Sequence, residues 1–115
     1  NSNVIQQPVK QVEIIGTKVS LPTGSHEDWM AAAGISPGDY GYANFIFTKE
    51  SGWRTTATNG TYYGLGQTSL SKLSSACPNW QSDPICQIKV FNNYAVGRYG
   101  SWSGAYNAWK TKGWW

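Results

Sequence analysis

The sequence predicts a mainly α domain, of the α+β kind in which a short loop or hairpin region follows one of the helices. Two observations lead to this fold class. Helix-start and helix-stop residues bracket several stretches of the chain, and apolar residues recur at steps of three and four between them. The chain has 115 residues, a length that favours one domain rather than two. We assign residues 20–115 to that domain.

The first two expected helices are delimited by their capping residues. Ser25 is followed three residues later by Asp28, a variant of the capping box that opens a helix, and Gly34 ends it. A second helix is expected from residues 36–39 to Ser51, where Gly52 stops it.

The second half of the chain shows the clearest helix. Residues 83–84 (Asp-Pro) are an N-cap followed by a proline at the first helical position. Apolar and aromatic residues then recur at helical spacing, namely Ile85, Ile88, Phe91, Ala95 and Tyr99. Gly100 ends this helix, and shorter helices are expected at 103–110 and around 70–75. Residues 55–66, rich in Thr, Gly, Asn and Tyr, form the expected loop or short hairpin.

Residues 1–19 differ from the rest of the chain. This strand-like stretch has apolar residues among polar ones, namely Val9, Val12, Ile14 and Ile15. This segment is either a linker or the tail of an upstream β domain, and the sequence does not choose between them.

Composition excludes several classes of partner. The net charge is only +3 and lysines and arginines do not cluster, so we expect no nucleic acid partner. No apolar run reaches membrane-spanning length, so no membrane span is expected. The chain has seven Trp and seven Tyr, more large rings than a core of this size usually holds. Some of them are expected to line a binding surface.

The single histidine limits the chemistry. His26 lies at an expected helix start, where an exposed position is the simplest interpretation. A Ser-His-Asp triad, a Cys-His pair or a histidine-ligated zinc site would each need this residue. We therefore expect no metal, no cofactor and no nucleophilic catalysis of these kinds.

The remaining candidates for a catalytic group are carboxylates, of which the chain has six. Four stand at helix starts, where capping explains them: Glu27, Asp28, Asp39 and Asp83. Glu13 lies in the strand-like segment. Glu50 stands at a helix end, on the same face as Ile46 and Phe47. Either desolvation raises the pKa of Glu50, as a general acid requires, or the helix ends where this side chain reaches solvent. Periodicity alone leaves both open.

Three segments resemble the soluble lytic transglycosylases. Residues 49–53 (Lys-Glu-Ser-Gly-Trp) match that family's Glu-Ser motif at a helix end, and residues 64–67 (Gly-Leu-Gly-Gln) match its Gly-Leu-Met-Gln motif with Gly for Met. Residues 105–109 (Ala-Tyr-Asn-Ala-Trp) resemble its third motif. The resemblance covers roughly residues 28–115, is strongest to the branch at the C-termini of secreted Gram-positive wall proteins, and implies a lysozyme-like fold.

The resemblance implies a reaction and the residues for it. Glu50 would be the catalytic acid/base that cleaves the MurNAc–GlcNAc β-1,4 bond of peptidoglycan strands, giving 1,6-anhydro products. Tyr106 would orient Glu50, and Gly66 in place of Met would remove a side chain from the groove floor. Substrate-binding positions would be Ser51, Tyr63, Gly64, Leu65, Gly66, Gln67, Tyr106 and Asn107. Candidates for stacking on sugar rings, with a core position as the alternative for each, are Trp53, Tyr62, Tyr63 and Trp102.

Two other functions stay open: a hydrolytic muramidase, and a non-catalytic peptidoglycan-binding module. Cys77 and Cys86 lie nine residues apart and by residue type alone are either a disulfide or two free thiols. The exported setting implied by the resemblance, extracellular or associated with the cell wall, favours the disulfide. We expect the domain to act as a monomer.

Overall fold

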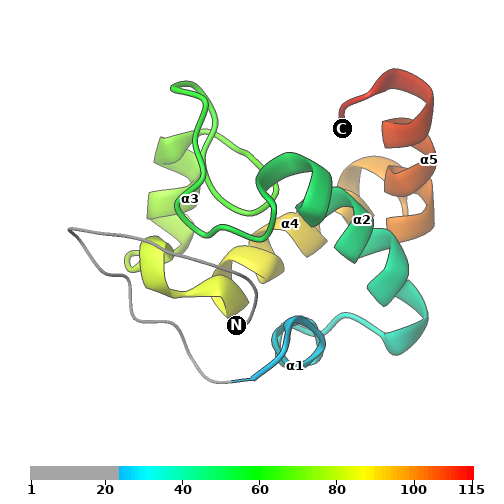
Figure 1. Cartoon of the computed structure of the whole chain (residues 1–115), viewed down its shortest axis with the longest axis horizontal. Coiled ribbons are helices and arrows are strands. Elements are labelled where there is room, and N and C mark those ends of the chain that lie inside the picture. The colour runs from blue at the N-terminus through cyan, green and yellow to red at the C-terminus, as the bar shows by residue number, and fades with distance from the viewer. Residues whose placement is uncertain (1–23) are drawn as a thin grey trace.

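The computed structural model describes residues 24–115, which form five α-helices and two 3-10 helices (Figure 1). In chain order these are α1 (His26–Ala32), η1 (Pro37–Asp39), α2 (Tyr40–Ser51), α3 (Leu70–Ala76), η2 (Trp80–Ser82), α4 (Pro84–Tyr99) and α5 (Trp102–Lys112). The mainly α prediction is confirmed. No sheet is present within residues 24–115, and the expected hairpin region contains only isolated bridges from Tyr63 to Thr58 and Thr68. The strand-like segment 1–19 lies outside the described residues.

The helix ends follow the predicted capping residues. The Ser25 hydroxyl accepts from the Asp28 N–H at 3.1 Å, and the Asp28 carboxylate accepts from the Ser25 N–H at 3.0 Å, which completes the capping box. The Asp83 carboxylate accepts from the backbone N–H of Cys86. Gly52 and Gly100 end α2 and α4 in the left-handed conformation that glycine adopts without strain.

Two helix starts differ from the prediction. The second expected helix is divided, because Asp39 has φ −100° and ψ −5°, outside the α-helical region, so η1 precedes α2. The last helix begins at Trp102 rather than Ser103, since the hydroxyl of Ser101 accepts from the Gly104 N–H and provides the N-cap.

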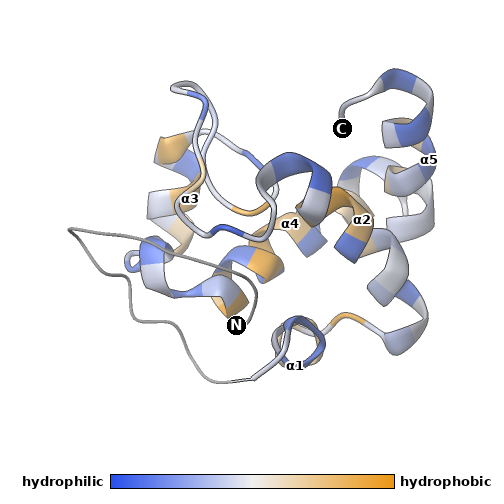
Figure 2. Cartoon of the chain, viewed as in Figure 1, coloured by the Kyte–Doolittle hydropathy of each residue, from blue (hydrophilic) through white to orange (hydrophobic). Residues whose placement is uncertain are grey.

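Helix α4 packs against α1, α3 and α5, and α2 packs against α1 and α5. In Figure 2 the hydrophobic positions of α2 and α4 lie near the place where these helices cross, whereas α5 is mostly hydrophilic or neutral. No helix of residues 24–115 is long and apolar enough to cross a membrane.

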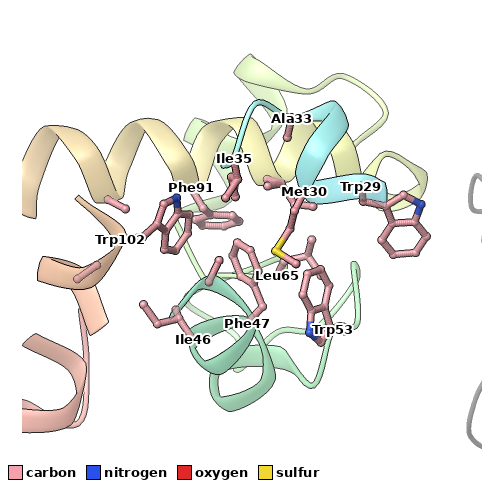
Figure 3. Packing of buried hydrophobic residues seen from close by; sticks show 14 of the residues in the cluster. Trp29, Met30, Ala33, Ile35, Ile46, Phe47, Trp53, Leu65, Phe91 and Trp102 are labelled. Carbon is pink, nitrogen blue, oxygen red and sulfur yellow. The ribbon is translucent and has the colours of Figure 1, made fainter. Parts of the chain in front are cut away.

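The main core is built largely from aromatic rings (Figure 3). Its buried members are Trp29, Met30, Ala33, Ile35, Ala43, Ile46, Phe47, Trp53, Leu65, Ile88, Phe91, Ala95, Trp102, Ala105 and Trp115. Phe47 makes edge contacts with Trp53, Phe91 and Trp102 at centroid distances of 5.1, 5.9 and 5.5 Å. Trp53 and Trp102 are 8% and 1% exposed, so these two stacking candidates are core residues instead.

His26 is not the exposed residue that its place at a helix start suggested. Its ring stacks on Trp53 with a centroid distance of 3.9 Å and an interplanar angle of 11°, and the residue is partly buried. Desolvation lowers the pKa of His26 below its usual value. The structure therefore gives this imidazole a packing contact.

A second, smaller cluster lies under α3 and contains a disulfide. Leu73, Cys77 and Trp80 are buried there, with Tyr63 packed against them. Cys77 is bonded to Cys86 across a Cα–Cα distance of 5.9 Å, and no cysteine is free. The predicted disulfide is confirmed. It joins the C-cap of α3 to the first turn of α4.

We expect the disulfide to contribute to stability mainly by restricting the unfolded chain. Closing a loop of about ten residues is worth about 2.7 kcal/mol on the chain-entropy scale. The double variant Cys77→Ala/Cys86→Ala should therefore lower the free energy of unfolding by roughly that amount in urea titrations. Thiol titration of the denatured, unreduced protein should find no reactive cysteine. Two reactive thiols, or a double variant as stable as the parent, would contradict this.

Candidate functional site

A cleft of about 610 Å³ is formed by the end of α2, the loop before α3, one side of α4 and the last residues of the chain. Its lining residues are Glu50, Tyr62, Gly66, Gln67, Thr68, Ser69, Lys72, Val90, Phe91, Tyr94, Arg98, Trp114 and Trp115. The volume falls within the usual range of small-molecule sites. The lining combines one carboxylate, two cations and several aromatic rings.

Glu50 lies in the last turn of α2 and is half-buried. The indole N–H of Trp109 donates to its Oε2 at 2.7 Å. Desolvation raises the pKa of Glu50, and the Trp109 hydrogen bond opposes part of that rise because it favours the ionised form. No lysine or arginine of residues 24–115 forms an ion pair with Glu50. The carboxyl group therefore holds its proton to higher pH than an exposed glutamate does.

The other carboxylates of residues 24–115 lie away from this cleft. Asp28 and Asp83 accept backbone hydrogen bonds at the starts of α1 and α4. Glu27 is exposed in the first turn of α1, and Asp39 is the N-cap residue of α2. Within the same part of the chain, no group of three or more His, Cys, Asp and Glu could hold a metal ion. Glu50 is the only carboxylate among the residues that line the cleft.

The turn at residues 64–67 forms one wall of the cleft and is held from α4. Leu65 donates its N–H to Oε1 of the buried Gln87 at 2.8 Å. Gln87 in turn donates to the carbonyls of Thr55 and Trp80 at 3.0 and 2.6 Å. The side-chain amide of Gln67 donates to the carbonyls of Ala57 and Gly64, and these bonds hold the turn to the preceding part of the loop.

Both glycines of this turn are needed sterically. A Cβ at Gly64 would lie 2.6 Å from Oε1 of Gln87, and a Cβ at Gly66 would lie 2.6 Å from the ring of Phe91. Gly64 also has φ +91°, which favours glycine. The family's Met would not fit at Gly66 in this loop, because its Cβ would meet the Phe91 ring.

Three predicted binding residues point elsewhere. The hydroxyl of Ser51 donates to the Phe47 carbonyl and accepts from the Trp53 N–H, and Ser51 is buried without lining the cleft. Tyr63 packs its ring against Trp80 in the second cluster, and Leu65 is buried in the main core. Tyr62, which is 50% exposed, lines the cleft in place of Tyr63.

The third predicted motif contributes a different residue. Tyr106 contacts Tyr42 and Phe45 at centroid distances of 5.1 and 5.0 Å and lines a separate hollow of about 520 Å³. It has no hydrogen bond to Glu50 among the described residues. Trp109 lies one turn further along α5, nearer the end of α2 where Glu50 stands, and makes that contact instead. Asn107 is exposed and lines neither hollow.

Sequence reasoning missed the opposite wall of the cleft. Phe91, Tyr94 and Arg98 are spaced by three and four residues, so they share one face of α4. This face continues the apolar stripe that identified the helix. The spacing of these residues was therefore a signal that one face of α4 lines the cleft. The apolar stripe alone does not include Tyr94 and Arg98. Lys72 and Trp114 complete this wall from other segments.

Removing the Trp109 hydrogen bond tests whether this contact lowers the pKa of Glu50. Trp109→Phe removes the N–H donor but keeps an aromatic ring against Phe45. Because the donor stabilises the ionised form, its loss should raise the pKa of Glu50 further. Carbon-detected NMR titration of the glutamate carboxyls measures the change.

Trp53→Phe is the matched control. It removes an indole N–H that bonds Asn44 and leaves the Glu50 contact in place, so the pKa of Glu50 should not move. An unchanged or lowered pKa of Glu50 in Trp109→Phe would show that this hydrogen bond does not tune the carboxyl group.

Comparisons of the chain with protein-family models, with curated proteins and with solved structures find no match. A functional assignment therefore depends on the residues of the cleft and on the three short segments whose order and spacing suggested a family.

Proposed function

We propose that this chain is a peptidoglycan lytic transglycosylase of lysozyme-like fold, with Glu50 as its single catalytic acid/base. The observation that carries the proposal is the setting of Glu50. It is a half-buried carboxyl group at a cleft, with one N–H donor, no cationic partner among residues 24–115 and a raised pKa. A group of this kind suits general acid catalysis.

The reaction follows from the two protonation states of Glu50. The protonated carboxyl donates its proton to the glycosidic oxygen as the bond from the MurNAc anomeric carbon to that oxygen breaks. The resulting carboxylate accepts the proton of the muramyl 6-hydroxyl, whose oxygen then bonds to the anomeric carbon. Trp109 stabilises the carboxylate between these steps through its N–H. The products are a 1,6-anhydro end and a free GlcNAc 4-hydroxyl, and Glu50 regains its proton.

Among residues 24–115 no second acidic side chain lines the cleft, which favours this route over hydrolysis. An inverting hydrolase needs a second carboxylate to activate water, and a retaining one needs a carboxylate nucleophile. Among the described residues that line the cleft, only Glu50 has an acidic side chain. The substrate would then supply both missing functions, with its N-acetyl group steadying the anomeric centre and its 6-hydroxyl attacking.

The rest of the cleft fits a sugar polymer. Tyr62 and Trp114 line it and are 50% and 52% exposed, so the exposed part of each ring offers surface for stacking on the apolar faces of sugar rings. The backbone of the 64–67 turn lines the same cleft at Gly66 and Gln67. The disulfide supports an exported protein, and we propose an extracellular or wall-associated site of action on peptidoglycan strands.

Glu50→Gln tests the catalytic role. The amide keeps the shape of the side chain and an oxygen for the Trp109 N–H, but it cannot donate a proton as an acid. We expect clearance of purified cell walls to fall by at least about a hundredfold, while circular dichroism and wall pelleting stay as in the parent.

Glu27→Gln is the control, since it makes the same change at an exposed carboxylate outside the cleft. It should clear walls as fast as the parent. A folded Glu50→Gln variant with parental activity would remove Glu50 from the mechanism, and a parent that pellets with walls but never clears them would be a binding module.

A further inference from the structure

Two cations lie on the wall of the cleft formed by α3 and α4. Lys72 comes from α3 and Arg98 from the last turn of α4, and both line the cleft that contains Glu50. Both are placed by the ring of Tyr94, at 5.6 Å for the Lys72 Nζ and 5.9 Å for the Arg98 Cζ. Arg98 also lies 5.9 Å from the ring centroid of Trp114. Cation–π contacts of this kind hold the charges beside the aromatic surface.

No acidic side chain of residues 24–115 neutralises this pair. Neither Lys72 nor Arg98 forms an ion pair with a carboxylate among residues 24–115. The one carboxylate of the cleft, Glu50, is bonded to Trp109 instead. The cleft lining therefore carries two formal positive charges against one ionisable acid. A cleft with this balance attracts an anionic group on its ligand.

We propose that Lys72 and Arg98 bind a carboxylate carried by the glycan strand, and so make the cleft selective for acidic strands over neutral ones. The inference rests on the proposed function. The planar guanidinium of Arg98 can bond both oxygens of a carboxylate, and the Lys72 ammonium adds a point charge beside it. The ring of Tyr94 contacts both cations and the ring of Trp114 contacts Arg98. These rings offer apolar surface for a sugar ring.

Peptidoglycan strands offer this carboxylate from two sources. A muramic acid without its peptide exposes the carboxylate of its lactyl group, and a muramic acid with its peptide exposes the carboxylates of the peptide. The recognition chemistry is the same in both cases. The test therefore uses short strands with and without peptides, each with its carboxylates either free or converted to amides.

Binding is measured with the full chain carrying Glu50→Gln, so that turnover does not consume the strands. Strands with free carboxylates should bind roughly three- to tenfold more tightly than their amidated counterparts, as expected for a partly exposed charge pair. Added salt should reduce the difference because it screens exposed charges. A difference seen only with peptide-bearing strands assigns the carboxylate to the peptide, and one seen only with peptide-free strands assigns it to the lactyl group. A difference seen with both shows that the two cations accept either carboxylate.

Adding Lys72→Gln and Arg98→Gln should abolish the preference while leaving the affinity for amidated strands unchanged. Lys89→Gln is the matched control, because Lys89 is an exposed cation of α4 that does not line the cleft, and it should keep the preference. Equal affinity for free and amidated strands in the parent, or a preference that survives the double change, would overturn the inference. Failure of the proposed function would look different: the unchanged chain would not clear walls, whether or not it binds the strands.

Discussion

The side-chain amide of Gln87 is the contact on which the arrangement of the cleft depends. It lies on α4, is fully buried, and bonds the N–H of Leu65 and the carbonyls of Thr55 and Trp80. The stretch between α2 and α3 has no sheet to satisfy its backbone, and a buried polar group left without a partner costs about 1–3 kcal/mol. One amide supplies an acceptor and two donors, so it fixes three distant backbone segments against a single helix.

The indole N–H groups extend the same principle through the aromatic core. Trp53 and Trp102 donate to Asn44 and Asn92, while Trp115 donates to the carbonyl of Gly66. Each indole buries a large apolar surface and also fixes a polar partner. Trp109 applies this to Glu50, so the group that tunes the carboxyl is itself packed against Phe45. The same kind of contact, an indole N–H donated to a polar partner, therefore links the elements of the core and positions Glu50.

The sequence was most informative where a local rule decides the outcome. Capping residues located both ends of α1 and α4 and the C-terminal end of α2, because a cap acts within one turn. Glu50 stood out because four other acids lay at expected helix starts and this one lay at the end of its helix, where a negative charge is unfavourable. The disulfide needed the additional assumption of an exported setting.

The predicted binding residues that do not line the cleft are ones whose placement depends on tertiary register. Tyr62 and Tyr63 are neighbours, and only the bridges from Tyr63 to Thr58 and Thr68 decide which ring reaches the cleft. Tyr106 and Trp109 lie one turn apart on α5, so the packing of α5 on α2 decides which of them meets Glu50. Motif spacing contains neither piece of information.

The central claim is that one carboxyl group, Glu50, breaks the glycosidic bond without a carboxylate partner in the cleft. The most direct measurement is mass spectrometry of the muropeptides released from purified walls, before and after treatment with borohydride. We expect products that are lighter by one water than hydrolytic muropeptides and that borohydride does not reduce, because their anomeric carbon is bonded to their own 6-oxygen. If borohydride reduces essentially every released muropeptide, water is the attacking group and the proposed transglycosylase reaction is wrong.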